Sequence, residues 1–248
     1  MSKPIVVIKV GGNDLEKLDF IPQLTAAIAQ LQTDVNCILV HGGGRTIDAL
    51  MNRLEIEPQY VEGQRVTDEA VLEVAELVLS GQINKRLVRA LLQQGVDSIG
   101  ISGVDGSLIQ VEPWSPEMGR VGRVVAVRGE VLETLIAAGY MPVVSPISLG
   151  VEGSYNVNAD HAAAAIALAV DAQRVVFLTN VPGVMVGDEI MAQLSHAKVQ
   201  ALIASGAING GMVPKVNAAL ETLEQGVGEA HITNLAGLQT GSGTTLYI

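Results

Sequence analysis

The first residues whose types and spacing could do chemistry are Lys9-Val10-Gly11-Gly12, directly after the apolar run Ile5–Ile8. Glycines in such a turn adopt conformations that other residues avoid and present backbone N–H groups to an anion. In open α/β sheets, ligands bind beyond the carboxyl ends of the strands. The segment therefore indicates a lysine and N–H donors at an anion site, although an ordinary strand–turn with a solvated lysine would contain the same residues.

A second glycine-rich turn, His41-Gly42-Gly43-Gly44-Arg45-Thr46, lies between an expected strand and an expected helix. A helix N-terminus offers N–H groups and the positive end of a dipole to an anion. The turn is not a GxxxxGK[ST] phosphate loop, and Ile47 stands where GxGxxG needs its last glycine. A flexible strand–helix connection is the alternative reading. We expect His41 to be packed or hydrogen-bonded rather than to act as a base.

Two further segments carry polar groups that could hold a small ligand. Arg65, in Gly63–Asp68, precedes a helix that we expect Thr67 to cap, and a guanidinium fork suits a carboxylate. In Asn156-Val157-Asn158-Ala159-Asp160, the asparagines occupy alternate positions and Asp160 lies near the start of an alanine-rich helix. A surface arginine and simple helix capping are the alternatives. The functional prediction is a carboxylate-binding arginine, ligand-binding amides and an organising carboxylate.

The last segment, Gly210-Gly211-Met212-Val213-Pro214-Lys215, opens another expected helix, with Pro214 suited to its first turn. A cation at the positive end of a helix is unfavourable unless an anion lies nearby. Lys215 therefore indicates phosphate chemistry. Together the glycine-rich turns and the two lysines follow the pattern of a nucleotide-phosphate site at one edge of an α/β sheet.

Apolar runs and helical patterns alternate along the chain, and these elements must position the candidate residues. We expect strands at 5–8, 37–40, 99–101, 141–145, 174–178, 230–232 and 244–248, and helices at 21–31, 46–54, 68–79, 83–94, 130–138, 159–170, 198–204 and 212–224. The helix at 68–79 should stop before Gly81, and Leu108–Val127 should form hairpins. Such alternation predicts an α/β fold with a mainly parallel central sheet sandwiched by helices. No low-complexity linker separates the halves, which favours two lobes that share one sheet.

Composition narrows the class of protein. The chain has 248 residues, of which 48% are hydrophobic and 3% aromatic, and its net charge is −11. An acidic, aromatic-poor chain is not expected to bind nucleic acid, although a few lysines in a cleft suit a small anion. The single cysteine, Cys37, excludes an intramolecular disulfide. Neither a signal peptide nor a membrane-spanning stretch is recognised, so we expect a cytoplasmic protein with no membrane partner.

In this order the motifs resemble the amino-acid kinase family, over essentially the whole chain. The segments that carry the resemblance are Lys9–Gly12, His41–Gly44, Gly63–Asp68, Leu79–Lys85 (LSGQINK), Asn156–Asp160, Leu178–Val184 (LTNVPGV) and Gly210–Lys215. The resemblance is greatest to the branch that phosphorylates the side-chain carboxylate of N-acetyl-L-glutamate in arginine biosynthesis, giving N-acetylglutamyl 5-phosphate and ADP. It implies an N-lobe of about residues 1–170 for substrate binding and dimerisation and a C-lobe of about 171–248 for ATP.

The resemblance also implies residue roles. Lys9 and Lys215 would be catalytic and stabilise charge on the transferring phosphoryl group, with Asp160 holding both lysines in position. The implied substrate-binding residues are Gly43, Gly44, Arg65 and Asn156. The implied nucleotide-binding residues are Gly11, Gly12, Thr179, Asn180, Gly183, Gly210 and Gly211. The implied cofactor is ATP with Mg²⁺ carried by the nucleotide, so no metal site formed by the protein itself is expected.

Two departures from the family pattern bear on these expectations. Asn180 stands where the family commonly has aspartate. Asparagine keeps the shape of aspartate but lacks its negative charge. The chain also begins almost at its first strand, without the helical arm that resembles a hexamer-forming, arginine-sensing element in some relatives. The expected form is therefore a homodimer that is insensitive to arginine.

Competing functions remain at this stage. The related kinase acting on carrier-linked α-aminoadipate in lysine biosynthesis is the first alternative, against which the Asn156–Asp160 form and the acidic surface argue. A non-catalytic nucleotide- or amino-acid-binding regulator is the second, and it predicts the loss of a lysine or of Asp160. Relatives that phosphorylate carbamate, aspartate, glutamate or UMP share the fold, so fold alone does not exclude those acceptors. A carboxylate acceptor is already ionised at pH 7 and needs no general base.

Overall fold

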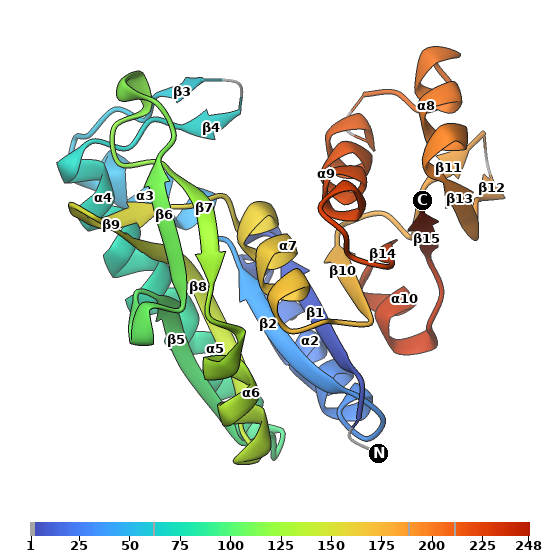
Figure 1. Ribbon diagram of the computed structural model, residues 1–248, viewed down its shortest axis with the longest axis horizontal. Helices are drawn as coiled ribbons and strands as arrows, with labels where there is room; N and C mark the ends of the chain where they lie inside the picture. Colours follow the sequence, from blue (N-terminus) through green and yellow to red (C-terminus); the bar gives the residue numbers. More distant parts are fainter. Residues whose placement is uncertain (1–2, 62, 188, 211) are drawn as a thin grey trace.

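The computed structural model describes residues 3–61, 63–187, 189–210 and 212–248 (Figure 1). Its strands are β1 Ile5–Val10, β2 Asn36–His41, β3 Tyr60–Val61, β4 Gln64–Arg65, β5 Ser98–Gly103, β6 Ile109–Pro113, β7 Gly122–Val127, β8 Met141–Gly150, β9 Gly153–Asn156, β10 Arg174–Leu178, β11 Met185–Val186, β12 Glu189–Ile190, β13 Gln193–Ser195, β14 Ala230–Thr233 and β15 Thr244–Tyr247. Its α-helices are α1 Gly12–Leu15, α2 Phe20–Leu31, α3 Gly44–Arg53, α4 Glu69–Glu76, α5 Asn84–Gln93, α6 Gly129–Ala137, α7 Ala159–Ala169, α8 His196–Ala204, α9 Met212–Glu224 and α10 Leu235–Thr240. A π-helix, η1, spans Leu77–Ile83, and two short 3₁₀ turns are η2 Asp105–Ser107 and η3 Pro116–Met118.

One sheet runs through both halves of the chain. In the described residues its order is β13-β15-β14-β10-β1-β2-β8-β6-β7, with β5 and β9 also paired to β8. The central pairs β10–β1, β1–β2 and β2–β8 are parallel, while the β6–β7 hairpin and the β14–β15 pair are antiparallel. The predicted α/β fold with a mainly parallel sheet is therefore confirmed.

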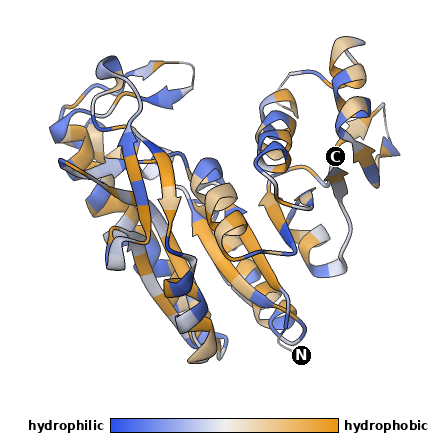
Figure 2. Ribbon diagram, viewed as in Figure 1, coloured by the Kyte–Doolittle hydropathy of each residue, from blue (hydrophilic) through white to orange (hydrophobic). Residues whose placement is uncertain are grey.

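Alternation along the strands builds a separate core on each face of the sheet. On β1, Val7 belongs to the core beneath α7 and α9, whereas Val6 and Ile8 belong to the core beneath α2 and α5. Successive side chains of a strand point to opposite faces, so a strand covered on both sides must be apolar throughout. Figure 2 shows this directly, because β1 and β2 are coloured as hydrophobic along most of their length. Figure 1 shows α7 in front of these strands and α2 behind them.

The largest departure from the sequence prediction lies at Gly81. The helices expected to stop before Gly81 and to restart at Ile83 are instead one helical stretch, in which η1 joins α4 to α5. A glycine inside a helix costs only about 1 kcal/mol relative to alanine. Leu79 and Ile83, which are at most 2% exposed, bury enough apolar surface in this stretch to outweigh that cost.

Smaller corrections concern capping and short elements. The cap of α4 is Asp68, whose side chain accepts a hydrogen bond from the Val71 N–H at 2.8 Å, and not Thr67 as predicted. Thr67 turns inward, is fully buried, and donates to the Arg65 carbonyl oxygen. The hairpin predicted within Leu108–Val127 is confirmed as β6–β7. The sequence patterns missed the short elements α1, β3, β4, β9, β11, β12, β13 and α10.

Among the described residues, no helix combines the length and apolar character that a membrane crossing requires.

Candidate active site

Two adjoining hollows lie at the carboxyl ends of the central strands. The wide cleft, of about 770 Å³, is lined by residues of both halves of the chain, including Lys9, Asp160 and Lys215. The narrow pocket, of about 200 Å³, is lined by residues that include Arg65 and Asn156. Gly44 and Gly63 line both hollows, so the narrow pocket opens toward the wide cleft at these glycines.

Lys9 lies near the end of β1, on the face of the sheet that α7 covers. Strand alternation places its side chain on the same face as Val7, and its ammonium group lies 2.8 Å from the Asp160 carboxylate. The Asn158 side chain accepts from the Asp160 N–H at 2.8 Å and caps α7, which leaves the Asp160 carboxylate free to pair with Lys9. The ion pair holds a cation at the floor of the cleft.

Lys215 enters the same cleft from the first turn of α9, across from Lys9. Its ammonium group donates to the Asn180 side-chain oxygen at 2.7 Å. Partial burial lowers the pKa of Lys215, and the Lys9 ammonium lowers it further against the opposing effect of Asp14. An anion placed between the two lysines would relieve this mutual repulsion.

The expected contact of Asp160 with both lysines is not observed among the described residues. Asp160 pairs with Lys9, while Lys215 is held by the neutral amide of Asn180. The reason lies in the arrangement of the elements, because α7 packs against β1, whereas α9, which carries Lys215, packs against β14 and β15.

The glycines of the two turns let backbone approach backbone. A Cβ atom on Gly12 would lie 2.6 Å from Gly43 Cα and 2.7 Å from Gly44 N, so no side chain fits there. Gly11 and Gly44 face open space, since a Cβ atom on either residue would have no other atom within 4 Å. The turns after β1 and β2 therefore pack against each other at the cleft, and Gly11, Gly12 and Gly44 line it without side chains, which lets an anion approach their backbone closely.

Arg65 is the charged residue of the narrow pocket, and its side chain is only 6% exposed. Its Nη1 lies 2.6 Å from an Asp48 carboxylate oxygen, and its Nη2 donates to the Tyr60 hydroxyl at 2.6 Å and to the Gly44 carbonyl at 3.1 Å. The Tyr60 ring also lies 4.9 Å from the guanidinium carbon. Partial burial and the hydrogen bond to Asp48 raise the pKa of Tyr60, so the phenol stays protonated and donates to Asp48.

Two asparagines, Asn156 and Asn158, line the narrow pocket together with Arg65. The Asn156 amide donates to the Thr67 hydroxyl at 3.2 Å, which ties β9 to the segment after Arg65. Gly43 and Gly44 line the same pocket. The four predicted substrate-binding residues thus surround one hollow that offers a guanidinium, an amide and backbone N–H groups.

The predicted nucleotide-binding residues fall into three groups. Gly11, Gly12, Thr179 and Asn180 line the wide cleft. Gly183 lies deeper, because a Cβ atom there would meet Thr244 Oγ1 at 2.7 Å. Gly210 has a φ of 55°, which suits glycine at the turn before α9, and Gly211 lies outside the described residues.

His41 faces the interior rather than either hollow, and it is fully buried. Burial lowers its pKa to about 4 despite the opposing hydrogen bond to the Gly42 carbonyl. The ring is therefore neutral at pH 7. The prediction that His41 is a packed or hydrogen-bonded histidine is confirmed.

Sequence reasoning missed Asp48 and Tyr60, the partners of Arg65. Asp48 lies one helical turn after Gly44 on α3, so its spacing from the glycine turn was the available signal. Tyr60 carried no signal, because it reaches Arg65 only through the two-residue strands β3 and β4.

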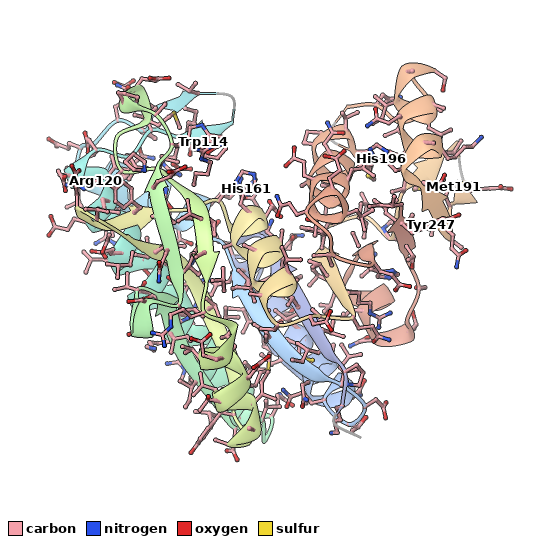
Figure 3. The ribbon with its side chains drawn as sticks, viewed as in Figure 1. Trp114, Arg120, His161, Met191, His196 and Tyr247 are labelled. Carbon is pink, nitrogen blue, oxygen red and sulfur yellow. The ribbon has the colours of Figure 1, made fainter. Side chains whose placement is uncertain are left out.

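A third hollow, of about 820 Å³, lies between β7, α7 and α9 and contains none of the predicted residues. His161, at the start of α7, stacks on Trp114 with ring centroids 5.7 Å apart and faces Glu221 of α9 at 3.8 Å (Figure 3). These contacts connect the helix that carries Asp160 to the helix that carries Lys215.

Within the ranges described above, no group of three or more His, Cys, Asp or Glu side chains is arranged to hold a metal ion. Asp14 and Asp160 are the carboxylates that line the wide cleft, and each pairs with a lysine. The wide cleft thus offers a metal ion two carboxylates beside cations and N–H groups, a set that suits a metal delivered with an anion and holding its own waters.

Comparison with known proteins relates this geometry to a family. The model of the amino acid kinase family matches residues 4–234. A protein named acetylglutamate kinase from Roseiflexus sp. (strain RS-1) is 49% identical over 99% of this chain and 94% of its own length. Proteins of the same name from Chloroflexus aurantiacus and Geobacillus thermodenitrificans are 46% and 43% identical, over 94% and 89% of their lengths and 96% and 92% of this chain.

Solved structures show the same architecture. N-acetylglutamate synthase from Neisseria gonorrhoeae, complexed with coenzyme A and N-acetyl-glutamate, matches with a TM-score of 0.84 at 25% identity, over 100% of this chain and 60% of that chain. Giardia carbamate kinase matches with a TM-score of 0.73 at 18% identity, over 100% and 99% of the two chains, and shows the fold alone.

Proposed function

The chain belongs to the amino acid kinase family, and from that premise we propose that it transfers the γ-phosphoryl group of ATP to the side-chain carboxylate of N-acetyl-L-glutamate. The products are N-acetylglutamyl 5-phosphate and ADP, and the reaction is a step of arginine biosynthesis. The relatives named acetylglutamate kinase, 41–49% identical over nearly the whole chain, support this substrate. The observation that carries the proposal is the narrow pocket around Arg65, which opens at Gly44 onto a cleft that contains two lysines.

The narrow pocket holds the acceptor. Arg65 binds a carboxylate of N-acetylglutamate that is not phosphorylated, with the Asn156 amide and the Gly43 and Gly44 N–H groups around the rest of the molecule. The side-chain carboxylate then points through the opening at Gly44 into the wide cleft. It is ionised at neutral pH, so it attacks without a general base.

The wide cleft holds the donor. The triphosphate lies along Gly11 and Gly12, and Thr179, Asn180, Gly183 and Gly210 surround the rest of the nucleotide in the C-lobe. One carboxylate oxygen forms a bond to the γ-phosphorus as the bond from that phosphorus to the bridging oxygen of ADP breaks. The charge on the transferring group rests mainly on its equatorial oxygens, so catalysis is positioning plus electrostatics.

The two lysines stabilise that charge from opposite sides. Lys9 is fixed from the N-lobe by Asp160, and Lys215 approaches from the C-lobe. Each ammonium interacts more strongly with the transferring phosphoryl group than with either separated reactant, which is the condition for lowering the barrier. Magnesium bound to the nucleotide would supply further neutralisation of the phosphates, and Asp14 and Asp160 are the cleft carboxylates that would interact with it.

The proposal includes the form and location of the protein. We infer a homodimer in the cytoplasm, with the N-lobe of about 1–170 binding acetylglutamate and making the dimer contacts and the C-lobe of about 171–248 binding ATP.

The direct experiment is an ADP-release assay with Mg·ATP and four separate acceptors: N-acetyl-L-glutamate, free glutamate, carbamate and carrier-linked α-aminoadipate. We expect turnover with N-acetyl-L-glutamate at a kcat/KM at least ~100-fold above the others, the scale on which a site built for a substrate's polar groups rejects analogues that lack them. Turnover with the carrier-linked substrate alone would move the function to lysine biosynthesis. Nucleotide binding without turnover on any acceptor would indicate a regulator.

A further inference from the structure

The segment Leu79–Lys85 has no role in the reaction described so far, yet it has an unusual conformation. It forms the π-helix η1 and the start of α5, and the Asn84 N–H donates to the Leu79 carbonyl oxygen, five residues earlier. A π-turn inserts an extra residue into a helix and is frequently found at functional sites. Here the insertion places the side chains of Leu79, Ile83 and Asn84 against the turn that follows β2.

The apolar residues of η1 contact the glycine turn directly. A Cβ atom on Gly43 would lie 2.5 Å from Ile83 Cδ1 and 2.7 Å from Leu79 Cδ2. Leu79 also lines the narrow pocket. The π-helix therefore forms the support on which Gly43 rests, and the fit leaves no room for a side chain at that position.

A second contact joins η1 to the part of β8 that lines the pocket. The Ser80 hydroxyl lies 2.8 Å from the hydroxyl of Ser145, which is fully buried in the middle of β8. Pro146, the next residue, lines the narrow pocket. One turn of η1 thus contacts both the glycine turn and the middle of β8.

A chain of hydrogen bonds joins the same helix to the Gly42 carbonyl. Asn84 is 1% exposed, and its amide donates to the Val143 carbonyl at 2.9 Å and lies 3.3 Å from His41 Nε2. Because the amide is a donor, Nε2 must accept, and the imidazole proton lies on Nδ1. Nδ1 then donates to the Gly42 carbonyl at 3.2 Å.

We propose that η1, Asn84 and His41 position the Gly42–Gly44 turn so that the N–H groups of Gly43 and Gly44 face the acceptor before the acceptor binds. A run of three glycines is the most flexible backbone a chain can have, and ordering it on binding would weaken affinity. The contacts with Leu79 and Ile83 and the hydrogen bond to the Gly42 carbonyl remove that freedom in the free protein. His41 and Asn84 are positioning residues, since they act on substrate only through the glycine turn.

The inference rests on the proposed function for the identity of the acceptor, and paired substitutions of His41 test it. His41→Asn retains a donor near the Nδ1 position and loses the acceptor for Asn84, whereas His41→Gln retains a group near Nε2 and loses the donor to Gly42. We expect both variants to raise the KM for N-acetylglutamate by ~5-fold or more, the scale of one lost hydrogen bond, and to change the KM for ATP less than ~2-fold.

The matched control is Ile38→Val. Ile38 is buried on the same strand as His41, but its side chain lies on the other face of the sheet. It should lower stability and leave both KM values unchanged. If the His41 variants behave like Ile38→Val, or raise both KM values equally, His41 only supports the fold and the proposal is overturned.

A spectroscopic experiment separates this inference from the proposed function. In the ¹⁵N NMR spectrum of the unliganded protein, we expect His41 to carry its proton on Nδ1, and we expect Asn84→Ser to shift the Gly43 and Gly44 amide signals. A proton on Nε2, or unchanged glycine signals, would overturn the positioning role. Failure to phosphorylate N-acetylglutamate would overturn the proposed function alone, because neither NMR measurement involves turnover.

Discussion

At the scale of single residues, the two lysines of the wide cleft are held in different ways. An ion pair with Asp160 fixes Lys9, whereas Lys215 is held by an uncharged amide, and its pKa is lowered by burial and by Lys9. An anion bound between the two lysines would offset their repulsion, and the transferring phosphoryl group is the anion placed there in the proposed reaction.

We therefore predict that Lys9→Ala and Lys215→Ala each lower kcat by at least ~100-fold, the scale for removing one preorganised charge partner. The measurement is ADP release at saturating concentrations of both substrates. Lys198→Ala, which removes an exposed lysine on α8, is the control and should leave kcat unchanged. A kcat near the wild-type value in either cleft variant would contradict the catalytic assignment.

Arg65 illustrates how a buried cation is prepared for a ligand. Asp48 neutralises it, and Tyr60 covers one side of the guanidinium and donates to Asp48. Charge-assisted contacts of this kind fix the plane of the guanidinium and so decide which N–H groups face the narrow pocket.

We predict that Arg65→Ala raises the KM for N-acetylglutamate at least ~10-fold, as expected for the loss of a hydrogen bond to a charged group, with little change in the KM for ATP. Asp48→Asn should raise the same KM by a smaller factor, because the guanidinium keeps its bonds to Tyr60 and Gly44 but loses its ionic anchor. Initial rates measured against each substrate in turn distinguish the two sides of the cleft. A rise in the KM for ATP instead would place Arg65 on the nucleotide side.

At the scale of elements, residue patterns predicted the long strands and helices because each needs an apolar stripe with a fixed period. They predicted α9 with its observed bounds and most other long elements within a few residues. They wrongly predicted a break in the helix at Gly81, because the low helix propensity of this glycine is outweighed by the burial of Leu79 and Ile83. Packing of this kind depends on which element lies across the sheet, and local sequence does not contain that information.

The candidate site shows the same division. The glycine turns and lysines that follow successive strands could be predicted as site residues from the sequence, because parallel strands end at one edge of the sheet. The residues that hold the site in place could not be predicted. Asp48 and Tyr60 contact Arg65, and Asn84 contacts His41, only because the fold brings them together. Asn180 is the instructive case, because the substitution was visible in the sequence but its contact with Lys215 became clear only in the fold.

At the scale of the whole molecule, one sheet contains strands from both halves of the chain and carries a buried core on each face. The turns that line the cleft are anchored in these cores, so local contacts near the site contribute to the stability of the entire fold. His41 on β2 and His231 on β14 are both buried and neutral, and burial lowers the pKa of each. Stability should therefore depend on pH through histidines that lie on different strands of the sheet, in different halves of the chain.

The sign follows from proton binding in the two states. The His41 pKa is about 4 in the folded protein against 6.5 for an exposed histidine, so between these values the unfolded chain binds more protons and stability falls as pH is lowered. The contribution is complete above about pH 6.5. From pH 7 to pH 5, His41 should account for a loss of about 2 kcal/mol in the free energy of unfolding, at 1.36 kcal/mol per pH unit below the unfolded pKa.

His41→Gln cannot take up this proton, so urea unfolding at pH 7 and pH 5 should show a smaller loss of stability for the variant than for the wild type. Equal losses in the two proteins would mean that His41 is already accessible to protons in the folded state, and the hydrogen-bond chain through Asn84 would then have to be abandoned.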